Sequence, residues 1–260
     1  MQSMSEVIRP LRVIVSGAKG KMGHEVVAAV TAEDDLRLVA EVDAGDSLTD
    51  ALASTKADVV VDFTVPEVAM GNIEAILRGG AVPVVGTTGL SPADIERVRA
   101  LCAEVGRGAL IAPNFAIGAV LMMRFAKEAA RFMPDAEVIE MHHGAKLDAP
   151  SGTAAKTAEM IAEGRGESRP APLPSDAFEK IAGSRGGKGA GDVPVHSVRL
   201  SGFVASQMVI FGGLGQTLTI RHDSLDRKSF MPGVILAVRR SPELASNGGK
   251  LVYGLENLIF

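Results

Sequence analysis

Short runs of apolar and β-branched residues recur through the first half of the chain, and each is followed by a turn and then by apolar residues at helical spacing. Runs that lack a polar face are typical of parallel strands buried on both sides of a sheet. Strands that alternate with helices at this spacing predict right-handed crossovers and a doubly wound parallel sheet. The predicted strands are residues 11–16, 36–42, 58–63, 82–85 and 109–112.

The second half of the chain predicts a different sheet. A β-like run at 136–141 leads through a polar loop into a helix-like run at 154–163. Three further β-like runs are separated by glycine turns, which indicates antiparallel strands. These runs are residues 195–199, 205–211 and 217–222. The middle run has apolar residues on both faces, so its sheet needs a cover that another subunit could supply.

The remaining segments connect these two parts. An amphipathic helix at 118–132 is expected to lead into the second part, and a helix at 229–240 to lead back. Residues 164–191 are rich in Gly, Pro, Ser and charge, and predict a long mobile loop without a packed core. Residues 251–260 should return to the first part.

The sequence thus predicts an α/β protein with two domains. A Rossmann-like dinucleotide-binding domain would comprise residues 1–116 and 226–260. An α+β substrate-binding and oligomerisation domain with a mixed or antiparallel sheet would comprise residues 117–225.

Composition narrows the function. The 260 residues are 47% apolar and carry a formal charge of −4, without a Lys/Arg run, so a nucleic-acid partner is not expected. No apolar stretch is long enough to span a bilayer, and residues 1–9 lack the apolar segment of a signal peptide and should fray. The single cysteine, Cys102, fits a reducing cytoplasm and an inert buried thiol.

A glycine-rich turn follows the first predicted strand and precedes a helix. Glycine lets the backbone approach a pyrophosphate, whose charge then meets the helix N-terminus. The spacing is Gly-x-x-Gly-x-x-Gly, and a tight turn without a ligand is the alternative. The candidate cofactor-binding residues here are Gly17, Ala18, Lys19, Gly20, Lys21 and Met22, with Gly23 completing the pattern.

The second predicted strand ends in Asp43, twenty positions after Gly23. An acid there is suited to bind an adenosine ribose hydroxyl, although a surface aspartate at a strand end is the alternative. It favours NADH because it would repel the 2′-phosphate of NADPH. Lys19 and Lys21 could offer that phosphate a counter-charge, so NADPH is not excluded.

Two turns follow the fourth and fifth predicted strands, at the edge where doubly wound sheets bind ligands. One contains Gly86, Thr87 and Thr88, and the other contains Ala112, Pro113, Asn114 and Phe115. Alternatively, these residue types are those of ordinary turns without a ligand.

The most specific stretch spans residues 140–153, between a strand-like and a helix-like run. His142 and His143 exchange protons near neutral pH, and Lys146 adds a positive charge. Asp148 or Ser151 could cap the helix, and the free amides after the cap could hold a carboxylate. This pattern indicates an anion site with proton donors beside it; a capped helix after a polar loop is the alternative.

The string 140–153, together with residues 17–23 and both turns, resembles the 4-hydroxy-tetrahydrodipicolinate reductase (dihydrodipicolinate reductase) family over nearly the whole chain. The resemblance implies NAD(P)H-dependent reduction of a cyclic imine in lysine and diaminopimelate synthesis, a small dicarboxylate substrate and a homotetramer. It implies catalytic roles for His142 and Lys146. Ser206 and Met208 depart from the family, which usually has His and Glu there. The implied substrate-binding residues are His143, Ser151, Gly152 and Thr153.

Alternatives from other classes stay open. Another nicotinamide oxidoreductase of amino-acid metabolism would share the first domain but should lack the 140–153 string. A non-catalytic NAD-binding sensor would bind cofactor without needing paired acids and an anion pocket. No metal is expected, because His142, His143 and Asp148 lack the usual zinc spacing and Lys146 would repel a cation.

Overall fold

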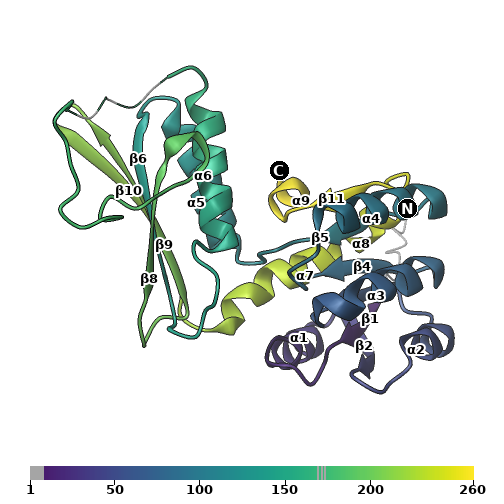
Figure 1. Ribbon diagram of the computed structural model, residues 1–260. Helices are drawn as coiled ribbons and strands as arrows, with labels where there is room; N and C mark the ends of the chain where they lie inside the picture. The colour runs from purple at the N-terminus through teal and green to yellow at the C-terminus, as the bar shows by residue number, and fades with distance from the viewer. Residues whose placement is uncertain (1–8, 169, 171, 173) are drawn as a thin grey trace, which may run out of the picture. The chain divides into compact units, whose positions relative to one another are not determined.

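The computed structural model describes residues 9–168, 170, 172 and 174–260. Most of the expected N-terminal extension and three positions of the predicted 164–191 loop therefore lie outside the described residues. The chain has two compact units (Figure 1). Unit 1 comprises Met1–Phe115 and Phe230–Phe260, and unit 2 comprises Ala116–Ser229.

Unit 1 contains a six-stranded sheet in the order β11-β5-β4-β3-β1-β2, in which every pairing is parallel. The predicted doubly wound sheet is confirmed. The order reverses direction around β1, so the turn after β1 lies at the switch point where such sheets bind nucleotides. Its strands are β1 (Leu11–Ser16), β2 (Leu36–Val42), β3 (Val59–Asp62), β4 (Val82–Val85), β5 (Ala109–Ile111) and β11 (Leu251–Tyr253).

Helices cover both faces of this sheet (Figure 1). On one face α2, α3 and α4 pack. Cys102 of α4 is buried between α4, α3 and the sheet, and burial raises the pKa of its thiol to about 11. On the other, α7 contacts α1 and strands β3 and β4. The helices are α1 (Lys21–Thr31), α2 (Leu48–Thr55), α3 (Pro66–Arg78), α4 (Pro92–Val105), α7 (Met231–Arg239), α8 (Ser241–Ala245) and α9 (Glu256–Ile259).

Unit 2 contains a mixed five-stranded sheet in the order β10-β9-β6-β8-β7. The expectation of three consecutive antiparallel strands is wrong for the first of them, because β8 pairs parallel with β6 and not with β9. Strand β6 therefore lies in the centre of the sheet, with β9 antiparallel on one side and β8 parallel on the other. The strands are β6 (Asp135–His142), β7 (Gly187–Lys188), β8 (Pro194–Arg199), β9 (Ala205–Gly213) and β10 (Gln216–Ser224).

The two faces of this sheet have different surroundings. Helices α5 (Ile117–Ala130) and α6 (Gly152–Arg165) pack on one face, where Val138, Val209 and Phe211 are fully buried (Figure 1). Side chains alternate along a strand, so Ile210 lies on the opposite face, where Val198 remains 36% exposed. Apolar residues therefore occupy both faces, as the sequence pattern predicted.

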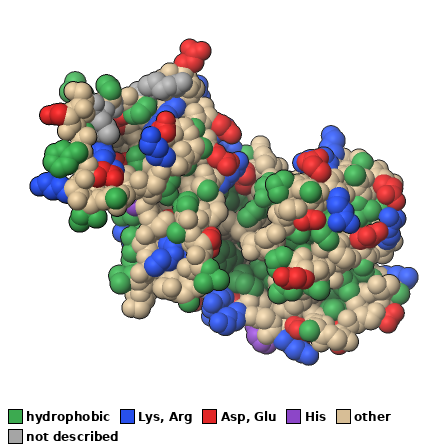
Figure 2. All heavy atoms as spheres, in the orientation of Figure 1, with side chains coloured by type: hydrophobic (Ala, Val, Ile, Leu, Met, Phe, Trp, Pro, Cys, Tyr) green, Lys and Arg blue, Asp and Glu red, His purple; other side chains and the backbone are tan. Residues whose placement is uncertain are grey.

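The predicted 164–191 loop is wrong at its start, because α6 continues to Arg165, whose side chain is buried. Its described part also contains the short strand β7, and a 3₁₀ turn at Ala190–Asp192 follows. No helix among the described residues is long and apolar enough to cross a membrane. On the face seen in Figure 2, the Lys and Arg side chains are interspersed with Asp and Glu.

Candidate functional site

The turn after β1 is built so that only glycine fits at its key positions. Gly17 has a positive φ of 78°, and a Cβ there would lie 2.5 Å from the carbonyl oxygen of Phe63. A Cβ at Gly23, on the first turn of α1, would lie 2.0 Å from the carbonyl oxygen of Gly17. The first turn of α1 thus lies directly against the loop, and its unpaired N–H groups are left for an anion.

Asp43, at the end of β2, is tied to this loop. Its carboxylate accepts the backbone N–H of Ala44 at 2.8 Å and that of Lys19 at 2.6 Å. These two hydrogen bonds, with a smaller contribution from the Lys19 charge, hold the pKa of Asp43 below its usual range. An ionised carboxylate therefore stands beside the loop, as a ribose hydroxyl would require.

A cleft of about 480 Å³ in unit 1 collects nine of the fourteen predicted cofactor residues. The predicted residues that line it are Gly20, Lys21, Met22, Gly86, Thr87, Thr88, Pro113, Asn114 and Phe115. The other five predicted residues do not line the cleft. Gly17, Ala18 and Lys19 belong to the loop after β1, and Asp43 accepts a hydrogen bond from the Lys19 N–H. Ala112 is buried. Three lining residues were missed by the sequence analysis: Phe63, Thr64 and Phe230.

Two of the missed residues carried a signal. Phe63 and Thr64 directly follow β3, at the same edge as the predicted turns, and the rings of Phe63 and Phe115 lie 5.7 Å apart. A Cβ at Gly86 would lie 2.1 Å from the Phe63 ring, so this glycine makes room for it. Phe230 is distant in the sequence, and no motif pointed to it.

A buried carboxylate at the end of β3 forms hydrogen bonds with the residues around this cleft. Asp62 is 0% exposed and accepts the hydroxyl groups of Thr64 at 2.8 Å and Thr87 at 2.7 Å. It also accepts the side-chain amide of Asn72 at 2.7 Å. A polar residue at the end of the apolar run Val59–Asp62 was the available signal. These bonds fix the turn after β4 relative to β3.

The second candidate site is in unit 2, at the end of the central strand β6. Glu140 is fully buried there, and its carboxylate accepts hydrogen bonds from both terminal nitrogens of Arg199, at 2.8 and 2.9 Å. The backbone N–H of Ser151 donates to the same carboxylate at 3.2 Å, and the Nδ1 atom of His142 contacts it. Glu140 and Arg199 were not predicted as site residues. The charge of Glu140 in a β-like run was the signal.

Electrostatics in this cluster favour a neutral imidazole beside a carboxylate. Burial lowers the pKa of His142; Glu140 raises it in part, while Lys146 and Arg199 lower it, and the result is below the ordinary value. Burial raises the pKa of Glu140, but hydrogen bonds from Arg199, Ser197 and His142 outweigh it and leave the pKa lowered.

The other polar residues of segment 140–153 do not contact Glu140 as His142 does, apart from Ser151. His143 follows the strand and is exposed, which agrees with the alternation of adjacent side chains. Its carbonyl accepts the N–H of Lys146 at 3.1 Å, so the chain turns here. The Lys146 ammonium pairs with Asp148 at 2.7 Å, and this hydrogen bond is the main cause that lowers the pKa of Asp148.

Helix α6 begins directly after this loop. Ser151 is buried and caps the helix, with its hydroxyl accepting the N–H of Ala154 at 3.2 Å. Of the two capping candidates, Asp148 instead pairs with Lys146. Gly152 is exposed and Thr153 half-buried in the first turn, where N–H groups have no acceptor within the helix.

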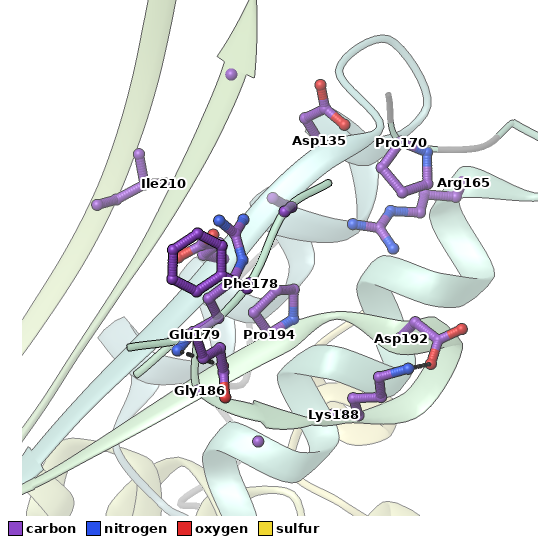
Figure 3. Close-up of a pocket in the computed structure, with 16 residues that line it drawn as sticks. Asp135, Arg165, Pro170, Phe178, Glu179, Gly186, Lys188, Asp192, Pro194 and Ile210 are labelled. Carbon is purple, nitrogen blue, oxygen red and sulfur yellow. Dashed lines mark hydrogen bonds and ion pairs between the residues drawn. The ribbon is translucent and has the colours of Figure 1, made fainter. Parts of the chain in front are cut away.

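A larger cleft of about 800 Å³ also lies in unit 2 (Figure 3). Its lining includes Phe178, Arg165 of α6 and Ile210 of β9, and contains none of the predicted site residues. An ion pair of 3.7 Å between Lys188 and Asp192 stands at its side.

Comparison with known proteins covers both units. A family model described as dihydrodipicolinate reductase, N-terminus, matches residues 11–115, and one described as dihydrodipicolinate reductase, C-terminus, matches residues 118–259. The 4-hydroxy-tetrahydrodipicolinate reductase of Desulfitobacterium hafniense (strain DSM 10664 / DCB-2) is 50% identical, over 97% of this chain and 100% of the relative. That of Listeria monocytogenes serotype 4b (strain F2365) is 50% identical, over 96% and 100%.

Solved structures agree with these matches. Dipicolinate-bound dihydrodipicolinate reductase from Paenisporosarcina sp. TG-14 is 39% identical and superposes with a TM-score of 0.84, over 96% of this chain and 100% of that one. A probable dehydrogenase from Thermotoga maritima, at 12% identity and a TM-score of 0.62 over 95% and 92% of the two chains, shares the fold.

Proposed function

The chain belongs to the dihydrodipicolinate reductase family of NAD(P)H-dependent oxidoreductases in lysine and diaminopimelate biosynthesis, and from this premise we propose its reaction and the roles of its residues. The reaction is reduction of the cyclic imine derived from 4-hydroxy-tetrahydrodipicolinate to tetrahydrodipicolinate. One observation carries the proposal: a histidine in contact with a buried carboxylate ends β6, and a lysine lies in the loop that follows, directly before the first residues of α6.

The cofactor role falls to the loop Gly17–Met22 and the cleft of unit 1. The fit rests on the N-terminus of α1, whose first N–H groups suit a pyrophosphate, and on the cleft of about 480 Å³ that the turns after β4 and β5 line beside it. The bound reduced nicotinamide supplies the hydride. Asp43 would bind the ribose hydroxyl and favour NADH. Lys19 and Lys21 would offer a counter-charge to the 2′-phosphate of NADPH, so the enzyme could also use NADPH.

The substrate role falls to His143, Lys146 and the first residues of α6. The related enzyme from Paenisporosarcina binds dipicolinate, a dicarboxylate, and we infer the same chemical class of ligand here. The amides of Gly152 and Thr153 suit one carboxylate. Lys146 can reach another, because its pairing with exposed Asp148 is of a kind worth only about 0–1 kcal/mol and is readily exchanged.

The proton chemistry falls to His142 and Lys146. Hydride addition to a conjugated imine leaves an electron-rich enamine that must take up a proton. A group positioned within hydrogen-bond reach lowers the barrier of that step. Ser151 acts indirectly, because its hydroxyl caps α6 and its N–H holds Glu140.

The test is an assay with freshly made substrate, formed from aspartate semialdehyde and pyruvate by the preceding synthase, in which oxidation of NADH and of NADPH is followed. We expect rapid oxidation by the wild type and a loss of roughly 10²–10⁴-fold in Lys146→Ala, with cofactor binding retained. Lys156→Ala, which removes a half-exposed lysine of α6 that pairs with Glu159, is the matched control and should remain near wild type. Absence of oxidation despite cofactor binding would refute the assignment.

We also propose a homotetramer. Its support is the apolar face of the unit 2 sheet that the helices leave uncovered, with Ile210 and the 36% exposed Val198. Ile210→Lys should lower the mass measured by sedimentation equilibrium. Glu128→Lys, on the exposed side of α5, should not. A wild-type monomer would contradict the proposal.

A further inference from the structure

Glu140 occupies a position where an apolar residue would satisfy the fold. Its side chain is fully buried, as is that of Val138 two residues earlier on the same face of β6. A charge here is costly unless donors surround it, and they do: Arg199 binds both oxygens, and the Ser151 N–H and the Ser197 side chain also donate. A carboxylate with a bidentate arginine retains its negative charge.

The contact between Glu140 and His142 defines where the imidazole proton lies. Oε2 of Glu140, an ionised oxygen that can only accept, faces Nδ1 of His142. The proton between them therefore belongs to Nδ1. In a neutral ring the other nitrogen, Nε2, then carries a lone pair, and no described residue forms a hydrogen bond with it.

Three charged groups act on this ring. Glu140 lies on its own strand, Arg199 lies on β8 directly opposite His142, and Lys146 lies on the loop that follows. The two cations oppose a second proton on the imidazole and the carboxylate favours it. Burial acts in the same direction as the cations, so the resting ring is neutral near pH 7.

We propose that Glu140 is a positioning residue that holds the His142 proton on Nδ1, so that the ring meets the substrate through the bare Nε2 and enters the reaction as a proton acceptor. The inference rests on the proposed function. When Nε2 accepts a proton from solvent, an O–H bond of the solvent breaks as the N–H bond forms, and the adjacent carboxylate stabilises the imidazolium. When the enamine takes this proton, the N–H bond breaks and the neutral ring returns. Lys146 is then the group that carries a transferable proton from the start.

A purely structural role for Glu140 is the competing explanation. Through Arg199, which donates to the carbonyl of Asp148 at 2.6 Å, and through Ser151, the cluster also joins β6, β8 and the loop. Loss of activity in a Glu140 variant would not distinguish the two roles. The protonation of the ring does.

The experiment is ¹⁵N NMR of histidine-labelled protein, with the His142 ring assigned by comparison with His142→Asn. In the wild type at neutral pH we expect the proton on Nδ1. In Glu140→Gln the amide can donate as well as accept, so we expect a mixture of the two tautomers and a fall in the His142 pKa, because its anion is gone. The acid limb of kcat/KM should move to lower pH, and kcat should fall at least about tenfold.

The matched control is Glu137→Gln. It removes the same charge from the same strand, and Glu137 also pairs with a histidine, the Nε2 atom of His196 at 2.9 Å. It should leave the His142 tautomer and the acid limb as in the wild type. Glu140→Asp, which retains the charge beside Arg199, should restore the Nδ1 proton and serves if Glu140→Gln fails to fold.

A wild-type proton on Nε2, or a folded Glu140→Gln protein with an unchanged tautomer and acid limb, would overturn the inference. The NMR measurement needs no turnover. A protein with the expected tautomer but without reductase activity would therefore refute the proposed function and leave the proton position established.

Discussion

The carboxylate of Asp43 accepts the backbone N–H of Lys19 at 2.6 Å. The two residues come from different turns, one after β2 and one after β1, and the hydrogen bond fixes them together beside the switch point of the sheet. A negative charge is thereby fixed at the loop that we assign to the cofactor. Cofactor preference should therefore depend on this one side chain.

Asp43→Ser should raise the ratio of kcat/KM for NADPH to that for NADH by about tenfold or more, because about 1.4 kcal/mol of lost repulsion corresponds to tenfold in affinity. Steady-state kinetics with both cofactors measure it. Glu41→Gln removes an exposed acid two residues earlier on β2 and should leave the ratio unchanged. An equal shift in both variants would mean that the general charge of the surface, and not this position, determines preference.

Gly17 and Gly71 should respond oppositely to alanine. At Gly17 a Cβ would meet the Phe63 carbonyl at 2.5 Å and φ is positive, so Gly17→Ala should lower the free energy of unfolding by more than about 1 kcal/mol and weaken NADH binding. Gly71 is a helical residue of α3 with nothing near its Cβ position, so Gly71→Ala should raise the free energy by about 0.5–1 kcal/mol. Denaturant titration and calorimetric NADH titration measure both; equal effects would refute the steric argument.

The sequence predicted the parallel sheet well because each buried strand of unit 1 is a short apolar run that ends in a turn, and such runs have one common structural solution. For the same reason it predicted that the turns after β4 and β5 lie at one edge of the sheet, because parallel strands bring their carboxyl ends together. The pairing of β8 with β6 was not predictable from the run itself. Residues 195–199 follow a turn-rich segment, and nothing local distinguishes a parallel from an antiparallel neighbour.

The residues that were missed act through long-range contacts. Arg199 is 59 positions from Glu140, and Phe230 reaches the cleft of unit 1 from a segment far along the chain. Periodicity reports the face on which a residue lies, but not which distant side chain it meets. Asp62 could have been found, because it is the one acid of the buried strand β3 and such a charge requires partners. Glu140 is one of three acids on β6, and its place on the same face as buried Val138 distinguishes it as the acid that requires partners.

The Thr87 hydroxyl should contribute more to the free energy of unfolding than the Thr88 hydroxyl. Thr87→Val removes the donor that reaches buried Asp62 at 2.7 Å and should lower the free energy of unfolding by about 1–3 kcal/mol. Thr88→Val, at an exposed position in the same turn, should change it by less than about 0.5 kcal/mol. Urea titration of both proteins provides the comparison, and similar losses would mean that Asp62 does not depend on this hydroxyl.

Acid should destabilise the protein in two steps with the same sign. Burial holds the pKa values of His142 and His222 below the ordinary range. Only the unfolded chain therefore binds their protons as the pH falls through about 6.5, and stability is lost from there downward. The pKa of Glu140 is also lowered, so its contribution is present above the ordinary range of a glutamate, about 4.3, and is lost as the pH falls through the lowered value. The free energy of unfolding, measured by urea titration from about pH 8 to about pH 2, should show both losses. His142→Asn should flatten the first, and a first step of unchanged size in that variant would assign it to His222 alone.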